Sequence, residues 1–156
     1  MIEISILVVM VLAALAVGFL VRRRDGKIRA ADTALSAESA DAAASVRAEL
    51  LASVGVTGTG PAVLHFSADW CGPCSAVRRV VTEATGQLAD AAAPPLDLEV
   101  DIDDEAALAR ELNVLSLPTT FVFDTEGRER FRISGVPKVT DLRSALEPLT
   151  VAAPLS

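Results

Sequence analysis

The only two cysteines of this 156-residue chain lie three residues apart, directly after a short apolar run. They belong to the segment Trp70-Cys71-Gly72-Pro73-Cys74, and the run before it is Ala62 to Ser67. Such a run is typical of a buried strand. A helix that starts near the second cysteine would bring the two Cβ atoms close enough for a disulfide. Gly72 permits the turn, and Pro73 suits a first helical turn, where its missing N–H costs little. The chain is therefore predicted to hold a thiol pair at a strand-to-helix junction.

The two thiols are predicted to differ in reactivity. Cys71 lies at the N-terminus of the expected helix, where free N–H groups stabilise a thiolate and lower the thiol pKa. Cys74 is expected one turn inside this helix and more buried, where it keeps its proton longer and serves as the resolving thiol. A zinc site is the first alternative, but it needs about four ligands and His65 is the only histidine. A purely structural disulfide is the second, and it would restrict the unfolded chain little across so short a loop. Redox chemistry without a metal is favoured.

The N-terminal part of the chain holds a continuous apolar stretch. Residues Ile4 to Val21 carry no charge, and a helix of this length is just long enough to cross a hydrocarbon core of about 30 Å. Basic residues follow directly: Arg22, Arg23, Arg24, Lys27 and Arg29. Basic flanks stay in the cytoplasm, so we expect a single-pass protein of the cell membrane with a cytoplasmic domain. A cleaved signal peptide is the competing interpretation, although Met1-Ile2-Glu3 lacks the basic start of such peptides.

The rest of the chain is acidic. Five of the fourteen basic and two of the twenty-one acidic residues precede residue 30, which leaves nine basic against nineteen acidic side chains. This balance argues against a nucleic-acid partner. The lack of any cysteine outside the pair suits a reducing compartment.

Composition and hydrophobic periodicity predict four segments. These are an anchor with its basic flank (1–24), a tether (25–45), a globular domain (46–150) and a short tail (151–156). Within the domain, apolar spacing predicts helices over 46–54, 73–88, from a cap at Asp103 or Asp104 through 112, and over 139–146. Strands are expected over 62–67, 96–102, 119–123 and 128–133, with a further strand possible near 27–29. This order predicts an α/β domain with a central mixed sheet and helices on both faces.

The element order and the Trp-Cys-Gly-Pro-Cys motif together resemble the thioredoxin family. The run Phe66-Ser67-Ala68-Asp69-Trp70 is similar to the family's approach to the motif, and Leu117-Pro118-Thr119 falls where the family has its cis-proline. The resemblance covers roughly residues 45–150. It implies a thioredoxin-like fold, preceded here by the predicted transmembrane helix. An ordinary trans proline at a strand entrance is the alternative for Pro118.

The resemblance also implies an activity. Family members with a Gly-Pro spacer reduce disulfides of protein substrates, so a membrane-tethered thiol-disulfide oxidoreductase acting through Cys71 and Cys74 is expected. No bound cofactor is implied, and a thioredoxin reductase or another thiol donor would restore the reduced pair. The residues expected to contact substrate are Trp70, Gly72, Pro73, Leu117, Pro118 and Gly135. Two alternatives remain: an extracytoplasmic reductase of exported proteins or apocytochromes, and a thioredoxin-fold binding module whose cysteines are incidental.

One position departs from the family pattern. The family usually buries an acidic residue six places before the first cysteine, and here that residue is His65. An imidazole, with an ordinary pKa of about 6.5, could relay the proton of the resolving thiol. The alternative is a hydrogen-bonded core histidine without a catalytic role. Glu99 stands near the family's lysine position on the next strand, so a reversed pair of His65 with Glu99 is predicted, provided that the strand register holds.

Overall fold

The structure, a computed structural model, describes residues 28–30 and 37–151. The predicted membrane span over 4–21 and the arginines at 22–24 lie outside the described residues. Helices in the described ranges are all too short or too polar to cross a bilayer.

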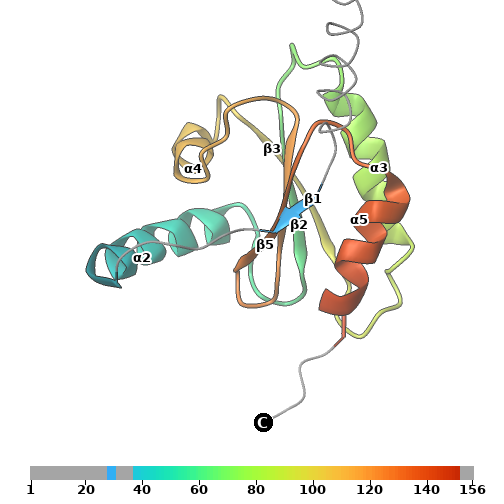
Figure 1. Ribbon diagram of the computed structural model, residues 1–156. Coiled ribbons are helices and arrows are strands. Elements are labelled where there is room, and N and C mark those ends of the chain that lie inside the picture. The colour runs from blue at the N-terminus through green and yellow to red at the C-terminus, as the bar shows by residue number, and fades with distance from the viewer. Residues whose placement is uncertain (1–27, 31–36, 152–156) are drawn as a thin grey trace, which may run out of the picture.

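Five strands and four α-helices make up the described part (Figure 1). In chain order the elements are β1 (Ile28–Ala30), α2 (Ala37–Ser53), β2 (Ala62–Ser67), α3 (Cys74–Gly86), β3 (Leu96–Asp101), α4 (Ala106–Glu111), β4 (Thr119–Phe123), β5 (Glu129–Ser134), α5 (Val139–Leu146) and the 3₁₀ turn η1 (Glu147–Leu149). The α/β architecture expected from the sequence is confirmed.

The strands form one mixed sheet in the order β1-β5-β4-β2-β3. The β2–β3 pair is parallel, and the other three pairs are antiparallel. Every residue of β2 is buried, as the apolar run Ala62 to Ser67 requires for a strand with neighbours on both sides. The turn that carries the cysteines therefore leaves from the interior of the sheet rather than from an edge.

Helices cover both faces of this sheet (Figure 1). Alternate side chains of each strand point to opposite faces, which divides the core in two. Leu64 and Phe66 of β2 pack with α2 and α4, and the Phe66 ring meets Phe121 edge-on at 5.9 Å between centroids. Val63 faces α3 and α5 instead and packs with Val77 and Leu142. His65 shares the α3 face because it is two residues from Val63.

Several element boundaries differ from the predicted ones. Helix α2 begins at Ala37, nine residues before the predicted start, and so includes part of the segment assigned to the tether. Helix α4 begins at Ala106 with Glu105 at its N-cap, not at Asp103 or Asp104, because the Asp101 carboxylate accepts the Asp103 N–H in a local turn. Helix α3 ends at Gly86. The strand considered near 27–29 is present as β1 and pairs with β5.

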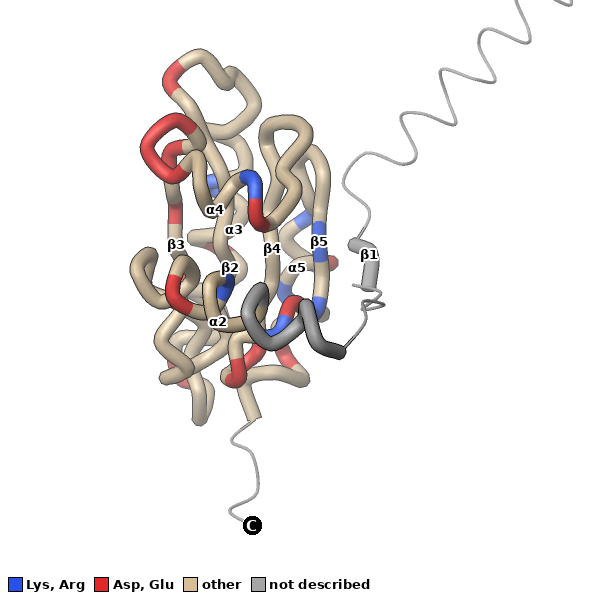
Figure 2. The backbone as a smooth tube through the Cα atoms, turned by 90° about the vertical axis from the view of Figure 1, so that its left-hand side faces the viewer, with Lys and Arg blue, Asp and Glu red and all other residues tan. Residues whose placement is uncertain are grey.

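Charge is distributed unevenly over the sheet. Figure 2 shows acidic residues along β3, at one edge, and basic residues along β5. At the β4–β5 turn the buried Asp124 carboxylate accepts hydrogen bonds from the Arg128 backbone and from the Arg128 and Arg130 side chains. Burial raises the pKa of Asp124, but these hydrogen bonds outweigh it and hold the pKa below its ordinary value. These hydrogen bonds therefore stabilise the turn between β4 and β5.

Candidate functional site

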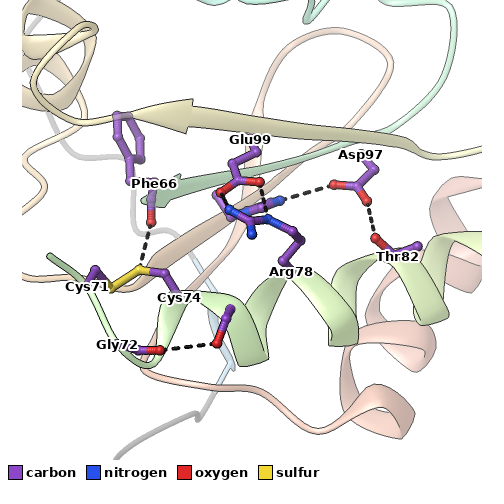
Figure 3. Close-up of polar contacts among 10 residues, drawn as sticks. Phe66, Cys71, Gly72, Cys74, Arg78, Thr82, Asp97 and Glu99 are labelled. Atoms are coloured by element: carbon purple, nitrogen blue, oxygen red, sulfur yellow. Dashed lines mark hydrogen bonds and ion pairs between the residues drawn. A yellow bond between two sulfur atoms is a disulfide. The ribbon is translucent and has the colours of Figure 1, made fainter. Parts of the chain in front are cut away.

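The two cysteines form a disulfide between the end of the turn after β2 and the start of α3 (Figure 3). Their Cα atoms are 5.5 Å apart. Cys74 is the first residue of α3, rather than one turn inside it as expected, and Pro73 is the N-cap. Cys74 is 4% exposed, whereas Cys71 is only partly buried. The predicted asymmetry, with one accessible and one enclosed sulfur, is present.

Backbone hydrogen bonds hold the cysteine turn in place. The Cys71 N–H donates to the Ala68 carbonyl at 3.0 Å, and the Cys74 N–H donates to the Cys71 carbonyl at 3.2 Å. Gly72 does not have a positive φ, and a Cβ at this position would meet no atom within 4 Å. The turn therefore does not require glycine at position 72 for its conformation, contrary to the expectation from the sequence. Gly72 is exposed, so the chain directly after Cys71 faces solvent.

The other predicted substrate contacts gather near the same end of the sheet. The Leu117–Pro118 bond is cis, as the resemblance implies. Thr119, the next residue, pairs with Phe66 near the end of β2 from which the cysteine turn leaves. Gly135, with φ of 86°, donates its N–H to the Pro118 carbonyl at 2.9 Å. Pro118 and Gly135 are thus joined directly, beside the strand end that carries the disulfide.

Exposed apolar side chains mark this region. Trp70 is 71% exposed, although Cys74, four residues later, is buried. Two further exposed residues were not identified from the sequence: Leu115, which is 85% exposed, and Val136. Their only indication in the sequence is their position: Leu115 lies two residues before Leu117, and Val136 directly follows Gly135, and both neighbours are predicted to contact substrate. An exposed apolar side chain directly beside Cys71, as Trp70 is, suits contact with a partner.

His65 is buried on the α3 side of the sheet and hydrogen-bonded to a carboxylate. Its side chain is 2% exposed, and Nε2 lies 3.1 Å from Oδ1 of Asp97. The other oxygen of Asp97 accepts the Thr82 hydroxyl at 3.0 Å (Figure 3). Among the hydrogen bonds of the described residues none joins His65 to Cys74, whose Sγ is instead directed at the Phe66 carbonyl at 3.8 Å. His65 therefore directly precedes Phe66 in β2, and the carbonyl of Phe66 faces the sulfur of Cys74.

The predicted pair of His65 with Glu99 requires correction. The register is as expected, with His65 opposite Glu99. Arg78 of α3, however, reaches over β3 and takes both Glu99 oxygens, one of them through Nε at 2.6 Å. The pKa of Glu99 is lowered to about 2, chiefly by these hydrogen bonds; burial opposes the shift, and the Ser67 hydroxyl and the charges of His65 and Arg78 contribute to it. The imidazole accordingly turns to Asp97, two residues earlier on the same strand.

One stripe of α3 organises these contacts. Cys74, Arg78 and Thr82 follow at intervals of four, which places them on the same side of the helix. Each is directed at a polar group of the sheet: the Phe66 carbonyl, Glu99 and Asp97. No group of three or more His, Cys, Asp or Glu side chains that could hold a metal ion occurs in the described ranges. What the site offers chemically is a disulfide with a buried imidazole and two carboxylates behind it.

Comparison with known proteins gives consistent results. The family model described as Thioredoxin matches residues 48–148. Thioredoxin H2-1 of Oryza sativa subsp. japonica is 42% identical over 76 residues, which cover 49% of this chain and 51% of that protein. Thioredoxin Asp f 28 of Aspergillus fumigatus is 36% identical over 73 residues, 47% of this chain and 63% of its own length. The chain thus spans about half to two thirds of the length of these curated relatives.

Solved structures show the same similarity. Thioredoxin O2 from Arabidopsis thaliana in its oxidised state has a TM-score of 0.52 at 31% identity, over 67% of this chain and 89% of that one. A mutant thioredoxin from Halobacterium salinarum NRC-1 has a TM-score of 0.53 at 28% identity, over 67% of this chain and 86% of that one.

Proposed function

The chain belongs to the thioredoxin family, and on that premise we propose that it is a protein-disulfide oxidoreductase that acts through Cys71 and Cys74. The observation that carries this proposal is the Cys71–Cys74 disulfide, in which Cys71 is partly exposed next to the exposed Trp70 and Cys74 is buried at the start of α3.

The reaction follows from that asymmetry. The Cys71 thiolate attacks one sulfur of a substrate disulfide, forms a mixed disulfide and releases the first substrate thiolate. The Cys74 thiol then loses its proton and attacks the Cys71 sulfur, which closes the Cys71–Cys74 disulfide and releases the second substrate thiolate. Two electrons pass to the substrate. A thiol donor, for which a thioredoxin reductase is the family's precedent, must return two electrons to the pair after each cycle.

The surface around Cys71 suits a protein substrate. Trp70, directly before Cys71, is largely exposed, and a Cβ at Gly72 would meet no neighbouring atom. An extended substrate segment could lie along the backbone at Leu117 and Pro118, because proline donates no N–H and the strand begins only at Thr119. We assign substrate contact to Trp70, Gly72, Pro73, Leu117, Pro118 and Gly135.

We further propose that His65 accepts the proton that Cys74 must lose. The imidazole is the buried basic group next in the strand to the carbonyl that Cys74 contacts. Since no direct hydrogen bond joins the two in the oxidised state, the transfer requires a shift of the imidazole or an intervening water.

Cysteine substitutions test the proposed reaction. Cys71→Ser should abolish reduction of insulin by dithiothreitol-recycled protein, because no other thiolate can open the substrate disulfide. Cys74→Ser should accumulate a mixed disulfide that mass spectrometry detects, because resolution is lost. Residual insulin reduction by Cys71→Ser would contradict the assigned roles. Unchanged cellular function of the double variant would favour a binding module instead.

We also propose that the domain is tethered to the cell membrane and faces the cytoplasm. The support is the uncharged stretch Ile4 to Val21 with its five following basic residues. A reporter active only in the cytoplasm, fused after Ser156, should be active, and reversing the basic flank to acidic residues should reduce that activity. An inactive fusion, with activity of a reporter for the opposite side, would support the extracytoplasmic reductase.

A further inference from the structure

A line of polar side chains crosses the α3 face of the sheet at His65. From β3 it includes Asp97 and Glu99, and from β4 it includes Thr120, the register partner of His65 on the other side. The Thr120 hydroxyl is fully buried and has no hydrogen-bond partner in the described part of the chain. Helix α3 contributes Cys74, Arg78 and Thr82 from above. The groups of this line that can carry charge are His65, Asp97, Glu99 and Arg78.

Only one of the two carboxylates is available to the imidazole. Glu99 lies directly opposite His65, but both of its oxygens are occupied by Arg78. Asp97 uses Oδ1 for His65 Nε2 and Oδ2 for the Thr82 hydroxyl. Because both oxygens of Asp97 have partners from different elements, the carboxylate and the ring hold each other in one orientation.

Exposure differs sharply along the same contact. The His65 side chain is 2% exposed, whereas that of Asp97 is 31% exposed because β3 is the edge strand. A proton on the buried ring therefore has a hydrogen-bonded path to a group that water reaches. The contact at 3.1 Å connects the interior of the site with solvent.

We propose that Asp97 is a positioning residue for the resolution step: it orients the His65 imidazole through Nε2 and passes the proton of the Cys74 thiol from that ring to solvent. The inference rests on the proposed function and on His65 as the proton acceptor within it.

Protons and electrons balance in this step. Cys74 S–H gives its proton through an intervening water to the ring nitrogen Nδ1, while the Nε2 proton moves to Asp97 and from there to solvent. The Cys74 thiolate attacks the Cys71 sulfur of the mixed disulfide; the S–S bond to the substrate breaks, and the substrate sulfur leaves as a thiolate. Ring and carboxylate return to their starting states when a tautomeric shift restores the Nε2 proton.

The central experiment measures the second step alone. Full-length protein carrying a preformed mixed disulfide between Cys71 and a fluorescent peptide thiol is prepared at low pH, and peptide release is followed after a jump to pH values from 5 to 8. Asp97→Asn should slow release about tenfold, a fraction of what general acid–base groups typically contribute. It should also change the dependence of the release rate on pH, because the carboxylate that accepts the Nε2 proton is replaced by an amide.

Three further variants separate positioning from mere structural damage. In a His65→Gln background, Asp97→Asn should cause no additional slowing, because Asp97 acts through the ring. Asp97→Glu, which keeps the carboxylate, should recover part of the rate. Asp90→Asn removes one negative charge from an exposed residue without a hydrogen bond or ion pair in the described structure, and it should leave the rate unchanged.

The outcomes are distinct. Unchanged release and an unchanged pH profile in Asp97→Asn would overturn the inference, as would slowing of equal size in the presence and absence of His65. If circular dichroism shows that Asp97→Asn is unfolded, Thr82→Val tests the inference instead. Because this variant removes the hydrogen-bond donor to Asp97 Oδ2, it should slow peptide release and change the pH dependence of the release rate. Failure of Cys71 to form the mixed disulfide in the unsubstituted protein would instead refute the proposed function.

Discussion

The Arg78–Glu99 pair allows a quantitative prediction for Glu99→Gln. In the folded protein the Glu99 pKa is about 2, against an ordinary value of 4.5 in the unfolded chain. At about 1.4 kcal/mol per pKa unit, this difference sets an upper limit of roughly 3.5 kcal/mol on the stabilisation by the carboxylate. The Glu99 side chain is 28% exposed and its partner Arg78 is 57% exposed. Solvent screening therefore reduces the expected loss of unfolding free energy in Glu99→Gln to about 1–2 kcal/mol at pH 7.

The pH dependence gives this prediction its sign. Because the folded-state pKa of Glu99 is lowered, its contribution is fully present above the unfolded value of 4.5 and disappears as the pH falls through about 2. The difference between the original protein and Glu99→Gln should thus shrink steadily between about pH 5 and pH 2.

Urea unfolding of the oxidised protein, followed by circular dichroism, measures this difference by linear extrapolation. Trp70 is a poor optical probe here, because it is largely exposed in the folded state. Asp90→Asn serves as the control for net charge and should not change stability. A destabilisation of equal size at pH 7 and at pH 2.5, or none at pH 7, would refute the reasoning.

Three further substitutions probe other features. Thr120→Val should raise the unfolding free energy by up to about 1 kcal/mol, because a buried hydroxyl without a partner is replaced by a methyl group of similar shape; a loss of stability in urea unfolding would contradict this. Gly60→Ala should destabilise by about 2 kcal/mol or more, since an added Cβ would lie 2.3 Å from the Pro94 carbonyl oxygen, and an unchanged thermal midpoint would exclude that clash. Asp124→Asn should cost about 1–3 kcal/mol through weaker hydrogen bonds to Arg128, with the loss smaller in acid because the folded-state pKa of Asp124 is lowered; a difference independent of pH would be inconsistent with this role.

The central strands and the last helix were predictable from the sequence. The bounds of β2 and α5 agree with the predicted ones. In both cases the apolar pattern predicts the element, and a nearby glycine or proline marks one of its ends. The local preferences of the sequence therefore agree with the packing of the fold. The start of α2 was not predictable in this way, because the segment from Ala37 to Ser45 has few large apolar residues. Alanine is the best intrinsic helix former, and an interpretation based on apolar spacing underestimates it.

The cysteine pair and its strand-to-helix setting were evident from the motif, whereas the partner of His65 was not. Strand register correctly placed Glu99 opposite His65. What decided the hydrogen bonding was a competitor from another element: Arg78 is only four residues beyond Cys74, but its contact with Glu99 depends on how α3 crosses β3. Such a choice between two neighbouring carboxylates arises from packing and leaves no periodic signal in the chain.

The position of β1 has a consequence for the behaviour of the protein at high concentration. Strand edges with free N–H and C=O groups are templates for the addition of another chain, and natural sheets protect them. Here β1 pairs along β5 and is itself the edge strand on that side, and its three residues make this edge very short. The opposite edge, β3, carries Asp97, Glu99 and Asp101, so a second copy that paired with β3 through its own β3 would bring like charges together. We therefore expect the folded domain to resist edge-to-edge aggregation, and we expect removal of residues 28–30 to weaken this resistance, because the six-residue β5 would then be the edge strand.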